Sequence, residues 1–311
     1  EILKDIDDHR MDYVDENEQL RTHFWNAVQR VEEDEGERWR EELNMPAIGD
    51  SWFAEEFLKI NARLKGTLRD ILERDGRRAS PEYAESIGID YTQLKVYLAH
   101  ERIRRQEHAD TPLFRGEMDA TYDLARHFHD GGTTQGLQHW PFSAQIVLVD
   151  EMHDLNYAMF RVLVEVLNTS QSYFCGMGDV DQVVHESTGA DAVFMGNAIA
   201  EHTARSIKRY PLTHSYRFGK SLAAKAGRVA DKPYSSHAEY DTQITLQQFD
   251  DEEQCAQQVL DTVKEWKKTR GRDMNALAIL LRHPAQSVAI ENLLIENELP
   301  YTMGGFESYL K

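Results

Sequence analysis

Two short apolar runs, each ended by acidic residues, constrain the fold of this chain more than any other feature. Gln145–Val149 is followed by Asp150-Glu151, and Ser172–Met177 is followed by Gly178-Asp179. A helical stretch through Phe160–Leu167 separates the two runs. This order is typical of a parallel α/β sheet with buried strands. Ligands of such sheets bind at the carboxyl ends of the strands, so the sequence predicts a site there.

The acidic pair after the first run suits phosphoryl transfer. Asp150 at a strand end can hold Mg²⁺ through water, and Glu151 beside it can orient and deprotonate an attacking water. An Asp-Glu pair that merely caps a strand is the alternative interpretation of this motif.

The second run leads into Gly176–Gln182, where glycines permit a tight turn. The Gln182 amide can donate and accept hydrogen bonds, so it could sense a terminal phosphate together with its water. Asp179, in the same turn, is a further candidate for the nucleotide site. An ordinary Gly-Asp turn is the alternative.

A third motif, Leu212–Arg217, places an aromatic ring beside an arginine. The Tyr216 ring could stack on a base while the Arg217 guanidinium meets phosphate. A surface arginine in a loop before a helix would leave the same pattern.

The segments on either side of these motifs have other patterns of apolar residues. Residues 1 to about 135 have helical apolar spacing, which predicts helices in four stretches: Arg21–Arg40, Trp52–Leu72, Tyr91–Ile103 and Met118–Phe128. A second α/β layer begins near residue 207. Its pattern predicts two strands and two helices: Ile244–Phe249, a helix capped by Asp250-Asp251 and running through Trp266, Ala276–Leu281, and Ser287–Leu294.

Composition limits the function further. No apolar run reaches the roughly 18 residues that a membrane span needs, so no membrane association is expected. The two cysteines, Cys175 and Cys255, have no metal-ligand spacing and are expected to be ordinary buried thiols of a cytoplasmic protein. The net charge of −19 argues against nonspecific DNA binding but permits a grip through local contacts and stacked bases.

Taken in order, the motifs resemble those of the UvrD/Rep-type superfamily 1 DNA helicases. Asp150–Asn156, Gly178–Gln182 and Ser215–Arg217 are similar to the family patterns DEhQDhN, GDxxQ and NYR, where h is hydrophobic. Leu281–Glu291 and Pro300–Phe306 resemble a later family segment. Three stretches of the helical part also match loosely: Trp52–Glu56, Arg74–Arg78 and Met118–Ala125.

The resemblance implies an α/β fold with RecA-like P-loop NTPase parallel sheets in two partial motor domains. It also implies an all-α insertion domain at the N-terminal side. Residues 1–138 would be this helical insertion, residues 139–206 the C-terminal half of the first motor domain, and residues 207–311 the N-terminal part of the second.

The resemblance also implies roles for single residues. Asp150 would organise Mg²⁺ through water, Glu151 would be the catalytic base, and Gln182 would contact the γ-phosphate of ATP. Arg217 would be the arginine finger, and Tyr216 would stack near the adenine. Arg282 would line either the cleft or the strand path. The partners would be ATP and single-stranded or duplex DNA; the sequence names no protein partner.

Four departures from the family pattern affect the expected chemistry. His153 stands where the family has glutamine, and Ser215 stands where it has asparagine. His185 and Ser187 occupy places where the family often has a Tyr and a Trp that stack on bases, and Thr188 replaces an arginine. Each lost ring would weaken strand grip by about 1–3 kcal/mol.

No Gly-x-x-x-x-Gly-Lys-Ser/Thr loop occurs in the sequence. That loop cradles the nucleotide phosphates, and in the family it would precede Glu1, while the last motor motifs would follow Lys311. We therefore expect a fragment of an ATP-dependent 3′-to-5′ DNA helicase that binds nucleotide poorly and is inactive alone. The alternative is a helicase-like binding or regulatory module without ATPase activity.

Overall fold

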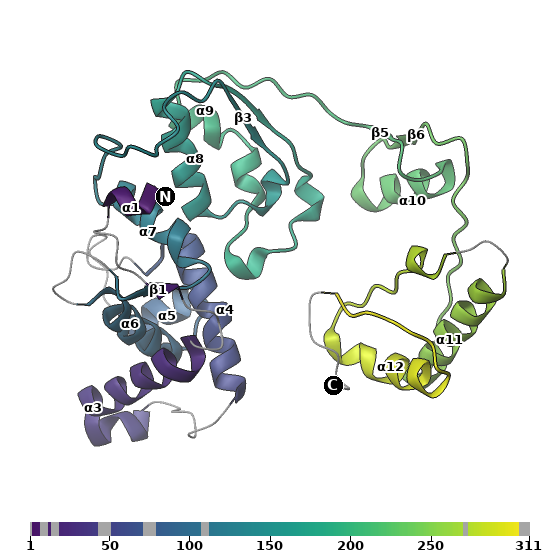
Figure 1. Cartoon of the computed structure of the whole chain (residues 1–311), viewed down its shortest axis with the longest axis horizontal. Coiled ribbons are helices and arrows are strands. Elements are labelled where there is room, and N and C mark those ends of the chain that lie inside the picture. Colours follow the sequence, from purple (N-terminus) through teal and green to yellow (C-terminus); the bar gives the residue numbers. More distant parts are fainter. Residues whose placement is uncertain are drawn as a thin grey trace. The chain divides into compact units, whose positions relative to one another are not determined.

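The chain divides between Tyr210 and Pro211 into two units, which are described one at a time. The structure is a computed structural model, drawn as a ribbon in Figure 1. It describes residues 2–6, 12–13, 19–42, 51–70, 79–106, 112–269 and 273–304.

Helices dominate the first unit, and its strands are short. Its α-helices are α1 (Ile2–Ile6), α3 (Trp25–Glu42), α4 (Ser51–Thr67), α5 (Pro81–Ser86), α6 (Tyr91–Arg105), α7 (Asp119–His129), α8 (Tyr157–Thr169) and α9 (Ala198–His202). Its strands are β1 (Asp12–Tyr13), β2 (Phe114–Arg115), β3 (Ile146–Val149) and β4 (Tyr173–Gly176). Single turns of helix complete the unit: η1 (Gln19–Phe24), η2 (Met152–Asp154), η3 (Val180–Gln182), η4 (Glu186–Thr188) and η5 (Ala192–Met195).

Helices α3 to α6 pack around one apolar core, whose centre includes Phe24, Phe57 and Leu94. Local chemistry sets where the helices begin: the Ser80 side chain accepts the N–H of Tyr83 at the start of α5, and Asp90 caps α6. The four helices predicted in this part are confirmed as α3, α4, α6 and α7. Leu72 and the Arg74–Arg78 motif lie outside the described residues.

The expectation of an all-α segment up to residue 138 needs one correction. β1 and β2 form a two-residue parallel pair, in which Asp12 is opposite Phe114 and Tyr13 is opposite Arg115. Because this pair joins segments about a hundred positions apart, no local periodicity in the sequence could have indicated it.

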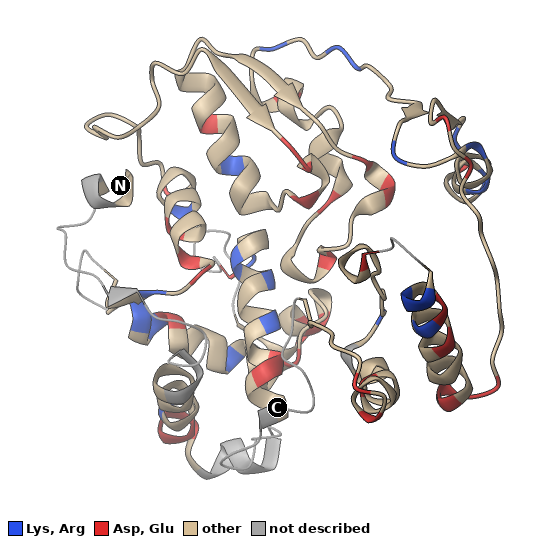
Figure 2. Cartoon of the chain, turned by 45° about the vertical axis from the view of Figure 1, so that its right-hand side comes forward, with Lys and Arg blue, Asp and Glu red and all other residues tan. Residues whose placement is uncertain are grey.

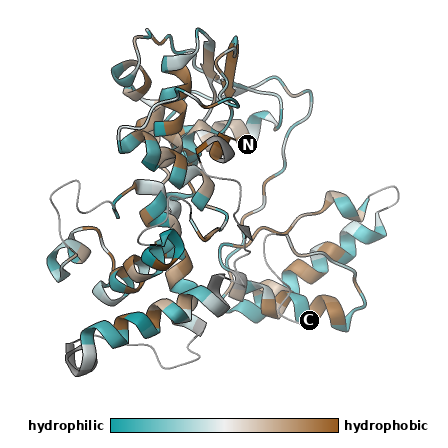
Figure 3. Cartoon of the chain, turned by 60° about the vertical axis from the view of Figure 1, so that its left-hand side comes forward, coloured by the Kyte–Doolittle hydropathy of each residue, from teal (hydrophilic) through white to brown (hydrophobic). Residues whose placement is uncertain are grey.

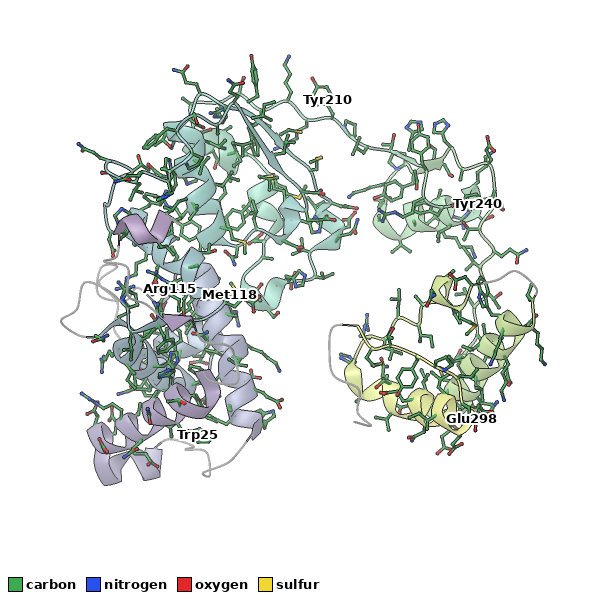
Figure 4. The ribbon with its side chains drawn as sticks, viewed as in Figure 1. Trp25, Arg115, Met118, Tyr210, Tyr240 and Glu298 are labelled. Carbon is green, nitrogen blue, oxygen red and sulfur yellow. The ribbon has the colours of Figure 1, made fainter. Side chains whose placement is uncertain are left out.

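A buried network of charged side chains ties α4, α6 and α7 together. The Arg104 guanidinium is fully buried and donates to Glu101 at 2.8 and 3.0 Å and to Asp123 at 2.7 and 3.0 Å. Arg115, labelled in Figure 4, reaches Asp123 at 2.6 Å, and Lys65 reaches Glu101 at 2.8 Å. Burial alone would raise the pKa of Glu101, but the charges of Arg104 and Lys65 outweigh burial and hold that pKa well below its usual range.

The predicted strand–helix–strand is confirmed as β3, α8 and β4. β3 and β4 pair in parallel, with Ile146 opposite Tyr173 and Val149 opposite Gly176. One face of this small sheet packs on α8 and on residues around η5. The Asn156 side chain caps α8 by accepting the N–H of Met159.

The prediction that these strands are buried is wrong for one face of the sheet. Ile146 is 63% exposed, Leu148 65% and Tyr173 82%. Figure 3 shows hydrophobic residues, in brown, along the two strands. Their second face has no cover among the described residues, so alternate side chains face outward. Cys175 lies on this open face and is exposed, while Cys255 is half-buried, which corrects the expectation of two buried thiols.

The second unit contains β5 (His214–Ser215), α10 (Lys220–Ala230), β6 (Ser235–Ser236), α11 (Glu252–Lys268), η6 (Met274–Ala276), η7 (Pro284–Gln286) and α12 (Ser287–Glu296). The two predicted helices are confirmed, and Asp251 caps α11 as expected. An apolar core lies between α11 and α12.

The two strands predicted in the second unit are not observed. Residues 244–249 and 277–281 have no strand assignment, and Leu246 and Leu280 are 84% and 94% exposed. A strand exists only when its backbone pairs with a neighbour. The described part of the chain gives these two segments no such neighbour. Among the described residues, no helix combines the length and apolar character that a bilayer crossing requires.

Candidate functional site

The carboxyl ends of β3 and β4 carry two loops that are joined by their main chains. The N–H of Met177 donates to the Val149 carbonyl oxygen at 2.8 Å, and the N–H of Met152 donates to the Met177 carbonyl oxygen at 2.7 Å. These bonds continue the ladder beyond the last paired residues. They bring Asp150 and Glu151 beside the turn that contains Gly178, and Figure 2 shows acidic residues, in red, at the ends of both strands.

Glu151 has a left-handed backbone, with φ +47° and ψ +45°. Its N–H donates to the Asp150 carboxylate at 2.9 Å, and its own side chain is 66% exposed. Non-glycine residues rarely adopt this conformation, and residues that do are concentrated at functional sites. The Glu151 carboxylate is exposed at the end of the strand.

His153 lies between the two loops and is only 4% exposed. Its Nδ1 accepts the backbone N–H of Asp179 at 3.1 Å, and its Nε2 lies 3.5 Å from a Glu151 carboxylate oxygen. His153 belongs to the loop after β3 and therefore links that loop to the loop after β4. The sequence distinguishes His153 only as a departure from the family pattern.

Asp179 organises the turn that follows β4. One carboxylate oxygen accepts the N–H of Asp181 at 3.1 Å, and the other accepts the Gln182 side-chain amide at 2.9 Å. Gln182 is exposed, so its amide is held by Asp179 while it remains accessible. Asp150, Glu151, Asp179 and Gln182 thus gather at one edge of the β3–β4 sheet.

The loop after Gln182 is anchored against α4 and α8. The Asn156 side chain donates to the Thr188 carbonyl oxygen at 3.4 Å. A Cβ on Gly66 would lie 2.2 Å from that same oxygen, so only glycine allows this approach. His185 is 58% exposed, and its Nε2 lies 3.9 Å from an Asp154 carboxylate oxygen.

In the second unit, the Ser215–Arg217 motif lies at the β5–β6 pair. Tyr216 is 75% exposed, and its ring stacks on the His237 ring at 5.4 Å, with 19° between the planes. Arg217 is exposed. The hydroxyl of Tyr240, labelled in Figure 4, donates to the Arg217 carbonyl oxygen at 2.7 Å. This segment therefore fixes the main chain of the motif and leaves its side chains accessible.

Arg282 also lies in the second unit and is exposed. Its backbone N–H and that of His283 both donate to the Gln286 side chain, at 3.0 and 3.1 Å. The described residues contain no group of three or more His, Cys, Asp or Glu side chains that could hold a metal ion.

Two family models match this chain. Residues 9–203 match the UvrD/REP helicase N-terminal domain, and residues 210–311 match the UvrD-like helicase C-terminal domain. The first match covers more than half of the chain. The chain belongs to the UvrD/Rep helicase family.

Individual relatives agree with this assignment. A putative ATP-dependent DNA helicase, YjcD, from Bacillus subtilis (strain 168) is 24% identical over 277 residues, which are 81% of this chain and 35% of the relative. The ATP-dependent DNA helicase PcrA of Staphylococcus epidermidis (strain ATCC 12228 / FDA PCI 1200) is 26% identical over 239 residues, covering 74% of this chain and 31% of the relative. The ATP-dependent DNA helicase Rep of Escherichia coli (strain K12) is 26% identical over 177 residues, covering 55% and 26%. The chain thus spans between a quarter and about a third of the length of these relatives.

Proposed function

We propose that this chain carries part of the ATP-hydrolysing site of a DNA helicase that moves 3′ to 5′ along single-stranded DNA and unwinds duplex. The observation that carries the proposal is the junction of the two strand-end loops. It gathers Asp150, Glu151, Asp179 and Gln182 at one edge of a parallel sheet. Membership of the UvrD/Rep family supports the same function.

Each residue at this junction has a role in the proposal. Mg²⁺ prefers carboxylate oxygens and keeps several waters, and the exposed Asp150 carboxylate at the end of β3 fits such a ligand. When bound, Mg²⁺ would neutralise charge on the phosphates of ATP. Glu151 would accept a proton from the attacking water, because its carboxylate projects outward. Gln182, held by Asp179, would contact the γ-phosphate.

The second unit would supply the remaining groups. Arg217 would stabilise the charge that develops on the transferred phosphoryl group, and Tyr216 would stack near the adenine. The bond from Tyr240 to the Arg217 carbonyl oxygen supports this role, since it limits movement of the arginine's main chain. Arg282 would line the nucleotide cleft or the path of the DNA strand.

The segments of the chain follow the same proposal. Residues 1–138 would form the helical insertion, residues 139–206 the C-terminal half of the first RecA-like domain, and residues 207–311 the start of the second. The helical packing of α3 to α6 supports the first assignment, and the parallel pairing of β3 and β4 supports the second.

The test is ATP turnover with and without single-stranded DNA, measured on the intact gene product and on this chain alone. Glu151→Gln in the intact protein should lower kcat by about 10²–10⁴-fold, the range for loss of a general base. Glu201→Gln is the matched control, because it makes the same change on an exposed glutamate of α9, which carries none of the proposed nucleotide or strand contacts. It should leave turnover unchanged.

DNA-stimulated turnover that Glu151→Gln abolishes would support the helicase proposal. No turnover in the intact protein would refute it and would leave the helicase-like binding module. His185 and Ser187, which replace stacking rings, are the observation that favours this second candidate.

A further inference from the structure

A buried histidine joins the proposed catalytic base to the proposed phosphate sensor. His153 is a buried residue of the loop after β3. Its Nδ1 faces the loop after β4, and its Nε2 faces Glu151 in its own loop. In a neutral imidazole one ring nitrogen donates a hydrogen bond and the other accepts one. The groups beside the two nitrogens therefore determine the orientation of the ring.

The bond to Asp179 determines which nitrogen carries the proton. The Asp179 backbone N–H can only donate, so Nδ1 of His153 must be the acceptor and must lack a proton. In the neutral ring the proton then lies on Nε2, which faces Glu151 at 3.5 Å. This distance is longer than an ordinary hydrogen bond. A carboxylate oxygen of Asp154 lies 3.9 Å from the same nitrogen, so Glu151 is the nearer of the two carboxylates that face Nε2.

Gly178 provides independent evidence for the tight fit of the two loops. A Cβ at Gly178 would lie 3.1 Å from both the backbone N and the Nδ1 of His153, and 3.0 Å from the Met195 methyl group. These distances are shorter than most real contacts of a Cβ. The absence of a side chain at this position therefore lets the turn after β4 approach the imidazole.

From Asp179 the chain of contacts continues to the sensor. The Asp179 N–H donates to His153, and the Asp179 carboxylate accepts the Gln182 side-chain amide at 2.9 Å. Glu151, His153, Asp179 and Gln182 thus follow one another in space as a series that we name the base–sensor chain. Two of its three links are hydrogen bonds, and the third is the 3.5 Å approach of His153 Nε2 to Glu151. A movement of Gln182 toward or away from phosphate would be transmitted to the carboxylate of Glu151.

We propose that His153 is a positioning residue that couples the orientation of Glu151 to the position of Gln182. This inference rests on the proposed function, since it assigns the coupling to ATP turnover. The neutral imidazole acts through two hydrogen-bonding atoms, one an acceptor and one a donor. A glutamine, which the family has at this place, also offers one acceptor and one donor.

The test uses two substitutions in the intact protein. His153→Phe keeps a flat ring of similar size but removes both hydrogen-bonding atoms, and His153→Gln restores an acceptor and a donor. His153→Phe should lower kcat by about 10–100-fold, the range for residues that orient a catalytic group. KM for ATP should stay within about 3-fold, because no contact to bound nucleotide is lost. His153→Gln should retain most of kcat.

Several outcomes would overturn the coupling. Wild-type kcat in His153→Phe would show that the ring only fills space, and equal losses in both variants would show that the two hydrogen-bonding atoms are not what matters. A rise in KM with unchanged kcat would indicate nucleotide binding instead. If His153→Phe does not fold, Gly178→Ala provides the same test, because it separates the loops and should lower kcat without changing KM.

One readout does not depend on turnover. Histidine-selective ¹⁵N NMR of the intact protein, with the His153 signals assigned by their loss in His153→Gln, should show a proton on Nε2 and none on Nδ1. A proton on Nδ1 would overturn the inference whether or not the protein hydrolyses ATP. Absence of turnover in the wild type with the expected tautomer would instead refute the proposed function.

Discussion

His100 should make the stability of the helical part of this protein sensitive to mild acid. Its ring is fully buried and meets the Phe57 and Phe114 rings edge-on, at 5.0 and 5.7 Å. Neither ring nitrogen has a hydrogen-bond partner among the described residues. Burial, with the nearby charge of Lys65, lowers the pKa of His100 from 6.5 to about 3, and Arg104 acts in the same direction.

The sign of the effect follows from linkage. The folded state holds His100 neutral, whereas the unfolded state takes up a proton below its ordinary pKa of 6.5. Stability is therefore fully present above pH 6.5 and is lost as the pH falls toward 3. With those two pKa values, His100 lowers the free energy of unfolding by about 2 kcal/mol at pH 5 and by only about 0.2 kcal/mol at pH 7.

His100→Phe should remove this pH dependence. Phenylalanine suits the aromatic surroundings, and replacing buried polar atoms that lack partners by apolar ones is close to neutral. Between pH 7 and pH 5, the variant should lose about 2 kcal/mol less unfolding free energy than the wild type. The measurement is urea unfolding at both pH values, followed by tryptophan fluorescence, to which Trp25 against the same core contributes.

The exposed His139 supplies the matched control, since His139→Phe should keep the wild-type pH dependence. The reasoning would be refuted if His100→Phe lost as much stability between pH 7 and pH 5 as the wild type does. That result would mean that His100 is protonated in the folded state or is accessible to water.

Three further predictions follow from single contacts. Arg104→Met should reduce the free energy of unfolding by about 3–5 kcal/mol in urea denaturation, because it leaves buried carboxylates without their partner. Arg105→Met is the control: this side chain is 38% exposed, so its loss should reduce the free energy of unfolding by about 1 kcal/mol or less. Gly66→Ala should lower the melting temperature, because the new Cβ would lie 2.2 Å from a loop carbonyl oxygen; an unchanged temperature would disprove this close approach. Tyr240→Phe should lower kcat of the intact protein a few-fold with little change in melting temperature. The substitution removes the hydrogen bond to the Arg217 carbonyl oxygen, a bond that contributes about 1 kcal/mol. A kcat equal to that of the wild type would exclude a role for this bond.

The parts of the fold that local sequence determines were predictable. β3, α8 and β4 lie where the apolar runs indicated, and Asp251 caps α11, because helix caps and strand periodicity are local properties. The clustering of acidic residues at the strand ends followed from the same reasoning, since parallel strands end at one edge. The catalytic roles of these residues stay predictions.

The parts that depend on distant partners could not be predicted. Residues 244–249 have a strand-like pattern, but pattern alone does not supply a paired neighbour. The bond between His153 and Asp179 joins positions 26 residues apart, so it appears only when the register of β3 and β4 is known. The stacking of Tyr216 on His237 likewise requires the pairing of β5 with β6.

The departures from the family pattern fall in two structurally different places. His153 lies inside the junction of the two loops, where it contacts the turn of Asp179 and faces the proposed base Glu151. His185 lies on the loop after Gln182, whose position is fixed by main-chain contacts of Thr188 and not by ring stacking. A substitution that removes an aromatic ring from that loop can therefore weaken stacking on a nucleic-acid base without moving the loop. We infer that substitutions there tune strand grip, whereas a substitution at His153 would act on turnover.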